Sequence, residues 1–257
     1  MSREAVARAG HFTTVQVRGG RVQGRDLHLA RLEDASRTLY GSAPGVSLIR
    51  ERIRAALREG GMSGGDCTLR VRILPARPGC RAGSPSQGVQ ALPLRIEIDL
   101  EALRDPPSAP LRLRTHAGLR ECAGVKHLAL DFQLEAKRAA QAAGHDDALL
   151  LAADGRISEG TFWNVLFWDG SAAVWPDAPA LMGTTWQLLE RELARAGVPQ
   201  RSRAIRVEAL GAMRAAFALN STGIADIAAV DGHVLPGDPA AGRRLRELLA
   251  DVPWENF

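Results

Sequence analysis

The feature that most constrains the fold is the length of the apolar segments, which are short and end at glycine, proline or Asp-Gly pairs. None reaches 18 consecutive apolar residues, the length that a membrane-spanning helix needs. Some alternate apolar with polar residues, as half-buried strands do, and others repeat apolar residues at helical spacing. A chain of 257 residues can bury a large core without disulfides or metals. The sequence therefore predicts a mixed α/β fold of the α+β type.

The first hundred residues predict a small layered unit. Its expected elements are a β-hairpin at 11–24 that turns at Gly19 and Gly20, helices at 26–41 and 47–61, and strands at 67–76 and 92–103. An acid at the start of the first helix is a candidate N-cap, and a Gly/Pro/Ser-rich segment, 76–93, separates the strands. We expect a small N-terminal α+β domain at 1–110, followed by a proline-rich connection at 111–123.

The remaining residues, 124–257, predict a larger domain. Its expected elements are a helix near 128–143, strands at 146–153 and around Glu159, a hairpin at 165–176 with Asp-Gly at its turn, a helix at 184–198 capped by Thr184 or Thr185, and a strand at 216–232 interrupted by Asn-Ser-Thr-Gly. No internal repeat links the two parts of the chain. The two domains are therefore expected to be unlike each other.

Composition and charge argue against several classes of protein. The net charge is +4, but basic and acidic residues are interleaved and aromatic residues make up 5%, which disfavours nucleic-acid binding. Cys67, Cys80 and Cys122 form no C-x-x-C pair and have no histidine at metal-ligand spacing, so we expect no metal site. The N-terminus carries charges where a secretory signal would be apolar. We expect a cytoplasmic protein without membrane spans.

The basic residues divide unequally, because only two of the 33 are lysine. Arginine does not readily lose its proton, whereas a desolvated lysine can become a neutral amine, attack a carbonyl and form a Schiff base. Lys137 lies in an Ala-rich helical pattern beside Arg138, which favours a solvated helix charge. Lys126 lies among small and apolar residues in "CAGVKHLAL". Lys126 is therefore the candidate nucleophile, with a snorkelling surface lysine as the alternative.

A second residue of interest is Glu159, an acid within the apolar strand-like segment "DGRISEGTFWNVLF". A buried carboxylate is costly unless a cation or a hydrogen-bond donor compensates it. Either a functional partner or an ion pair with one of the arginines would explain its presence.

The sequence resembles the class IV aminotransferases in five blocks that occur in the expected order. They are "HLARLEDAS" at 28–36, "KHLA" at 126–129, "GHDDALLLAADGRISEGTFWNVLF" at 144–167, "LMGTTWQLLE" at 181–190 and "ALNSTGIADIAAVDG" at 218–232. The family includes branched-chain and D-amino acid aminotransferases and aminodeoxychorismate lyase. The resemblance implies the two-domain fold of type IV pyridoxal phosphate enzymes, with a β-barrel-like sheet and helices in the larger domain. It also implies pyridoxal 5'-phosphate as cofactor and a homodimer.

The resemblance implies roles for particular residues. Lys126 matches the Schiff-base lysine, which carries a proton between Cα and C4′ as base and then acid. Glu159 matches the acid that faces the pyridine nitrogen and keeps the ring electron-withdrawing. Arg31 matches the arginine that binds the cofactor phosphate. Further phosphate donors are expected at a helix start and in the opposite loop, from Thr184, Thr185, Ser221 and Thr222. Asn164 is expected to have a supporting role.

The resemblance is incomplete at the cofactor's phenolic oxygen and at the substrate. A tyrosine that branched-chain members place after the lysine is replaced here by Leu130 or Asp131, and the sole tyrosine is Tyr40. Candidates for binding a substrate carboxylate are Arg112, Arg114, His116, His11 and Thr13. We expect an aminotransferase acting on an amino acid and a 2-oxo acid. An aminodeoxychorismate lyase and a homologue with lost or repurposed catalysis are the alternatives.

Overall fold

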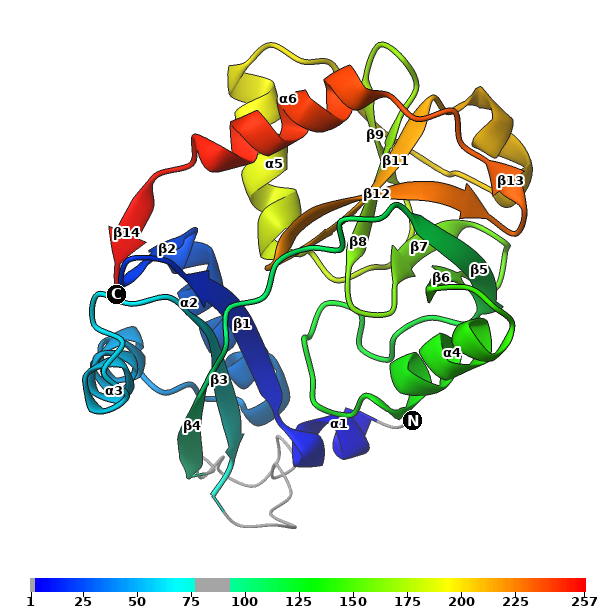
Figure 1. The fold of residues 1–257 in the computed structure, drawn as a ribbon. Helices are drawn as coiled ribbons and strands as arrows, with labels where there is room; N and C mark the ends of the chain where they lie inside the picture. The colour runs from blue at the N-terminus through cyan, green and yellow to red at the C-terminus, as the bar shows by residue number, and fades with distance from the viewer. Residues whose placement is uncertain (1–2, 77–92) are drawn as a thin grey trace. The chain divides into compact units, whose positions relative to one another are not determined.

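The computed structural model describes residues 3–76 and 93–257, and their contacts form two compact units (Figure 1). The first unit comprises Met1–Arg104, Val125–Leu130 and Pro253–Phe257, and the second comprises Asp105–Gly124 and Asp131–Val252. Most of the predicted segment at 76–93, with Cys80, lies outside the described residues. Both units combine helices with a sheet, so the mixed α/β class is confirmed.

The first unit is an antiparallel sheet of order β1-β3-β4 with helices packed on one face. Its elements are α1 (Arg3–Ala9), β1 (His11–Val17), β2 (Arg21–Gln23), α2 (Arg25–Tyr40), α3 (Val46–Glu59), β3 (Cys67–Pro75), β4 (Leu94–Glu101) and β14 (Trp254–Asn256). Alternate residues of β1 and β3 pack with α2 and α3 into one apolar core, as the alternating pattern predicts. The helix at 25–40 begins after Gly24 without a side-chain cap, so the predicted acidic cap is wrong.

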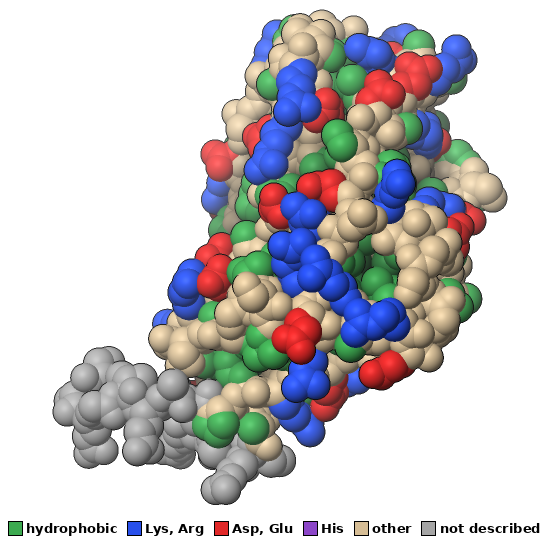
Figure 2. Space-filling model, turned by 90° about the vertical axis from the view of Figure 1, so that its left-hand side faces the viewer, with side chains coloured by type: hydrophobic (Ala, Val, Ile, Leu, Met, Phe, Trp, Pro, Cys, Tyr) green, Lys and Arg blue, Asp and Glu red, His purple; other side chains and the backbone are tan. Residues whose placement is uncertain are grey.

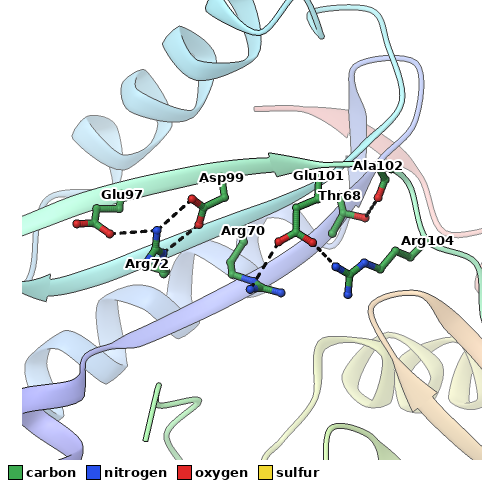
Figure 3. Close-up of polar contacts among 8 residues, drawn as sticks. All are labelled: Thr68, Arg70, Arg72, Glu97, Asp99, Glu101, Ala102 and Arg104. Atoms are coloured by element: carbon green, nitrogen blue, oxygen red, sulfur yellow. Dashed lines mark hydrogen bonds and ion pairs between the residues drawn. The ribbon is translucent and has the colours of Figure 1, made fainter. Parts of the chain in front are cut away.

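The opposite face of this sheet carries a ladder of charged residues (Figure 3). Arg72 on β3 pairs with Glu97 at 3.1 Å and with Asp99 at 2.9 Å on β4. Glu101 is shared by Arg70 and Arg104. Cross-strand pairs of opposite charge stabilise a sheet modestly, because these groups stay partly solvated. The ladder therefore fixes the register of the first sheet more than it adds to its stability.

The last residues of the chain complete the first unit. Strand β14 pairs antiparallel with β2, and Arg25 bonds to both Glu255 and the main-chain oxygen of Asn256. Phe257 is buried in the first core, and Arg54 donates to its main-chain oxygen at 2.7 Å. The second arm of the predicted hairpin, β2, thus bonds mainly to a strand from the other end of the sequence.

The second unit is built on a nine-stranded sheet curled into a half-barrel (Figure 1). The strand order is β10-β9-β8-β11-β12-β5-β6-β7, with β13 paired to β12. Its strands are β5 (Leu111–Ala117), β6 (Asp147–Leu151), β7 (Ile157–Gly160), β8 (Asn164–Trp168), β9 (Ala173–Pro176), β10 (Gln200–Arg203), β11 (Ala215–Asn220), β12 (Gly223–Val230) and β13 (His233–Val234). Its helices are α4 (Asp131–Ala142), α5 (Thr184–Arg195), the 3-10 helix η1 (Val207–Ala212) and α6 (Pro239–Ala250). The predicted hairpin at 165–176 is confirmed as β8 and β9.

Two local predictions in the second unit are wrong. The segment at 216–232 is not one interrupted strand but two antiparallel strands, β11 and β12, joined by a turn at Ser221 and Thr222. Asn220 makes this turn because its side-chain oxygen accepts from both the main chain and the hydroxyl of Thr222. Helix α5 begins after Gly183 with no side-chain cap, so neither Thr184 nor Thr185 is its N-cap.

On the face in Figure 2, Lys and Arg side chains lie near Asp and Glu side chains, and several Lys and Arg side chains adjoin one another near the middle of the view. None of the helices within the described ranges has the length and hydropathy that crossing a membrane requires.

Candidate functional site

Lys126 is anchored in the first unit by its main chain. Its carbonyl accepts from the main-chain N–H of Phe12 at 2.9 Å, and the N–H of Leu128 donates to the carbonyl of Gly10 at 2.8 Å. His127 forms an antiparallel bridge with His11, so this short segment extends the sheet beside β1. The ammonium nitrogen of Lys126 lies 4.9 Å from the centre of the Phe12 ring. The side chain is thus directed by the sheet and not by a helix.

Arg31 lies on α2 of the same unit, and its charge, like that of Lys126, lowers the pKa of His28. Burial, together with the charges of Arg31 and Lys126, lowers the pKa of His28 to about 3. The Nδ1 of His28 and the Oγ1 of Thr13 lie 2.7 Å apart. The structure therefore brings Arg31 and Lys126 into electrostatic range of one buried, neutral histidine.

Two candidate carboxylate ligands on β1 point into the first unit. His11 is fully buried, its Nε2 lies 2.9 Å from Ser36 Oγ, and burial lowers its pKa to about 4. Thr13 is also buried, against His28. Tyr40 is buried as well, and its hydroxyl donates to the main-chain oxygen of Ala7. These side chains serve the packing of α1 and α2 against the sheet.

Glu159 lies on β7 of the second unit with its side chain 2% exposed. Its Oε1 accepts from Arg120 Nε at 3.0 Å. Its Oε2 accepts from Asn164 Nδ2 at 3.4 Å and from the main-chain N–H of Leu181 at 3.3 Å. Arg120 is 4% exposed and also donates from Nη2 to the main-chain oxygen of Thr161 at 3.2 Å. The buried acid is thus ion-paired, as one interpretation of the sequence foresaw.

Asn164 links Glu159 to the start of α5. Its Nδ2 also donates to the main-chain oxygen of Leu181 at 2.7 Å. A Cβ at Gly183 would lie 2.0 Å from Asn164 Oδ1, so only glycine fits before the helix. Asn164 therefore has the supporting role that the sequence suggested.

A second buried acid, Asp147, supports the segment that carries Glu159. It accepts from Thr161 Oγ1 at 2.6 Å and Trp163 Nε1 at 3.2 Å, and it pairs with Lys137 Nζ at 3.1 Å. The indole of Trp163 lies where a Cβ on Gly160 would be, so this glycine is required. Lys137 lies on a helix and stays partly solvated, as its Ala-rich surroundings predicted, but it also pairs with this buried acid.

The start of α5 and the β11–β12 turn lie together. Thr185 Oγ1 donates to the main-chain oxygen of Asn220 at 2.7 Å, which joins the helix to the turn formed by Ser221 and Thr222. Thr184 is 5% exposed, and its Oγ1 has no hydrogen-bond partner in the described part of the chain. The first N–H groups of a helix lack intrahelical acceptors and attract anions. Thr184, Thr185, Ser221 and Thr222 thus gather around one helix start.

Arg120 is the residue that sequence reasoning missed. It is one of many arginines, and its partner Glu159 lies 39 residues further along the chain. The available signal was the short segment "GLREC", where an arginine stands in a Gly-containing connection just before the lysine block. The other candidate ligands, Arg112, Arg114 and His116, lie on β5, where the two arginines are exposed and His116 contacts the Phe132 ring.

Comparisons with known proteins identify a family and similar folds. A family model for amino-transferases of class IV matches residues 10–230. The fold resembles that of a hypothetical aminotransferase from Mycobacterium tuberculosis in a PLP-bound form, at 24% identity and a TM-score of 0.81, covering 96% of this chain and 90% of that chain. It also resembles the branched-chain aminotransferase from Thermoproteus uzoniensis with norvaline, at 19% identity and a TM-score of 0.81, covering 94% and 84%.

A further similar structure is the 4-amino-4-deoxychorismate lyase from Pseudomonas aeruginosa, at 28% identity and a TM-score of 0.77. The similarity covers 94% of this chain and 90% of that chain. No curated protein sequence gives a significant match.

Proposed function

Because the chain belongs to the class IV aminotransferases, we propose that it moves an amino group between an amino acid and a 2-oxo acid, with Lys126 as the reactive amine. Enzymes of this family use pyridoxal phosphate. The observation that carries the proposal is the placement of Lys126, one of two lysines in the chain, on a short segment where main-chain bonds to β1 fix its position. An amine so positioned can attack a carbonyl and afterwards take and return a proton.

The chemistry of these side chains suits the proposed cofactor. A phosphate needs a cation and several donors, which Arg31 and the start of α5 would supply, the latter through Thr184, Thr185, Ser221 and Thr222. The buried, unpartnered hydroxyl of Thr184 is a donor that an anion would satisfy. A protonated ring nitrogen needs an anion, which Glu159 would supply. When bound, the cofactor supplies a ring that withdraws electrons from the substrate's Cα.

Each of these residues would have a separate task. Lys126 would hold the cofactor's aldehyde and move the proton at the substrate's Cα, and Glu159 would hold a proton on the ring nitrogen. Arg31 would neutralise the phosphate, since its planar guanidinium suits a dianion. The amino acid and the 2-oxo acid are the proposed substrates, and a homodimer and a cytoplasmic location stay predictions.

A lyase acting on aminodeoxychorismate is the second candidate. The similarity to the Pseudomonas aeruginosa lyase favours it, as does the "VKHL" sequence around Lys126. Both reactions would use Lys126 and Glu159 in the same way, because each needs a proton to leave the carbon that bears the substrate's amino group. The substrate decides between them.

The experiment is covalent trapping followed by a donor screen. Borohydride reduction of the protein with pyridoxal phosphate should leave a pyridoxyl group on Lys126, and Lys126→Ala should lose both the adduct and its visible absorbance. The matched control is Lys137→Ala, which removes the other lysine and should keep both. A label on Lys137, or none, would overturn the assignment and favour a homologue without catalysis.

Conversion of the absorbance band to the pyridoxamine form by an amino acid would support transfer. Pyruvate release from aminodeoxychorismate without that conversion would support the lyase. A panel of L- and D-amino acids identifies the amino donor in the same assay.

A further inference from the structure

We propose that Arg120 is a positioning residue that keeps Glu159 ionised and thereby assigns the shared proton to the cofactor's ring nitrogen. The inference rests on the proposed function, because it concerns the residue to which that function gives the ring nitrogen. Arg120 and Glu159 both belong to the second unit, and their side chains are 1% and 2% exposed. The pair is therefore almost completely withdrawn from water.

The first step in the argument is the orientation of the guanidinium. Its Nε donates to Glu159 Oε1 at 3.0 Å, while its Nη2 donates to the main-chain oxygen of Thr161 at 3.2 Å. Two donors of one rigid planar group thus fix the carboxylate relative to the main chain two residues away. Thr161 is itself bonded to the buried Asp147. The position of Oε1 is therefore set by a connected network and not by the glutamate's own rotamer.

The second step is the difference between the two carboxylate oxygens. Oε1 accepts a charged hydrogen bond, whereas the Asn164 and Leu181 donors to Oε2 are neutral and lie at 3.4 and 3.3 Å. Charge-assisted hydrogen bonds are roughly twice as strong as neutral ones. Arg120 thus makes the strongest of these three hydrogen bonds to the carboxylate.

The third step concerns the proton. A carboxylic acid withdrawn from water takes up a proton unless a cation lies close to it. A protonated Glu159 would offer a hydroxyl to the ring nitrogen and leave that nitrogen without a charge. With Arg120 in place, Glu159 stays an anion and favours a proton on the nitrogen instead. Arg120 therefore acts on the cofactor through Glu159, without touching it.

The test on the protein without cofactor is infrared spectroscopy of Glu159. Arg120→Gln removes the charge and keeps donor groups of similar reach, so a carboxylic-acid carbonyl band should appear at neutral pH and vanish in Arg120→Gln/Glu159→Gln. Arg120→Lys keeps the charge and should show no band. The matched control is Arg246→Gln, which breaks the pair with Asp226, both half exposed, and should show no band either. A spectrum of Arg120→Gln without the acid band would overturn the proposal.

The test on the loaded protein is ¹⁵N NMR of labelled cofactor. The ring nitrogen should be protonated near neutral pH in the wild type and in Arg120→Lys, and should lose its proton at least tenfold more readily in Arg120→Gln. If Arg120→Gln does not fold, the infrared spectrum of Glu159→Gln is subtracted from that of the wild type. A carboxylic-acid band in this difference spectrum would mean that Glu159 is protonated in the wild type, which contradicts the proposal. Failure to bind cofactor refutes the proposed function alone, because the infrared result is obtained without cofactor.

Discussion

The two units hold their principal functional candidates in opposite ways. Lys126 in the first unit is fixed through the main chain at the edge of the sheet. Its carbonyl accepts from the N–H of Phe12, and the N–H of Leu128 donates to the carbonyl of Gly10. Glu159 in the second unit is fixed through its carboxylate, by Arg120, Asn164 and the main chain of Leu181. An amine that must leave and return during a reaction needs a fixed backbone, whereas an acid that keeps a ring protonated needs fixed oxygens. The two kinds of anchor match these two tasks.

The two units also differ in how their buried titratable side chains are accommodated. In the first, two buried histidines stay neutral, because burial lowers the pKa of His28 to about 3, with Arg31 and Lys126 adding to the effect, and lowers that of His11 to about 4. In the second, buried acids are paired with cations, Glu159 with Arg120 and Asp147 with Lys137. The first unit therefore depends on groups that must not be protonated, and the second depends on pairs that must not be broken.

The largest expected effect is in the second unit. Glu159→Gln should keep the cofactor bound but slow turnover by about three orders of magnitude, because a neutral amide does not hold the ring nitrogen protonated. It also leaves the Arg120 cation buried without its anion, which should lower the free energy of unfolding by about 3–5 kcal/mol. Steady-state kinetics and urea denaturation measure the two effects.

The matched control for that variant is Asp226→Asn, which breaks a pair whose side chains are 42% and 45% exposed. We expect a loss of about 1 kcal/mol or less and unchanged turnover. Equal losses for the two variants would show that burial does not distinguish the pairs.

The second prediction concerns acid and the first unit. Above the unfolded pKa of about 6.5, His11 and His28 are neutral in both states and pH has no effect through them. As the pH falls below that value toward about 4 and 3, the unfolded state binds protons that the folded state does not. Each histidine then lowers stability by about 1.4 kcal/mol per pH unit. Hydrogen exchange at pH 6 and pH 5 should show the amides of β1 losing protection before those of β11. Equal losses, or a loss on raising the pH, would contradict this.

The third and smallest effect separates two adjacent threonines. Thr184→Val removes a buried hydroxyl without a partner in the described residues, so the protein without cofactor should be as stable as the wild type. The same variant should weaken pyridoxal phosphate binding about tenfold if that hydroxyl bonds the phosphate. Thr185→Val instead breaks the bond to Asn220 and should lower stability by about 1 kcal/mol. Thermal denaturation and cofactor titration check both. A stability loss in Thr184→Val with unchanged affinity would assign it to packing.

Local patterns predicted most of the elements because each depends on near neighbours. The alternation in "CTLRVRILPA" predicted β3, and the apolar spacing of "TTWQLLERELARAGV" predicted α5. The helix starts were predicted to within one residue, but the capping residues were wrong because Gly24 and Gly183 stand before α2 and α5, and a glycine at that position gives no side-chain signal. The turn at Ser221 and Thr222 was missed because the polar residues there suggested only an interruption.

The candidate site was predicted only as far as the family blocks reach. These name Lys126, Glu159 and Arg31, and their roles stay predictions. Arg120 was out of reach because a contact across 39 residues leaves no periodic trace, and because arginine is common in this chain. The pairing of Lys137 with Asp147 was missed for a similar reason, since Asp147 lies in a different element. The predicted domain boundaries at residues 110 and 123 also stay predictions. A division of the chain by its internal contacts does not show which part binds a ligand.

Strand β14 and Phe257 have a consequence for how this protein is made. The core of the first unit includes the side chain of Phe257. Its main-chain oxygen accepts a hydrogen bond from Arg54, 203 residues earlier in the sequence. During translation, α2, α3 and β3 leave the ribosome long before that side chain exists, so an apolar gap stays open while the half-barrel is being synthesised. The nascent N-terminal layer therefore stays partly assembled until residues 254–257 have been made. Folding of this layer is thus coupled to synthesis of the second unit that precedes them.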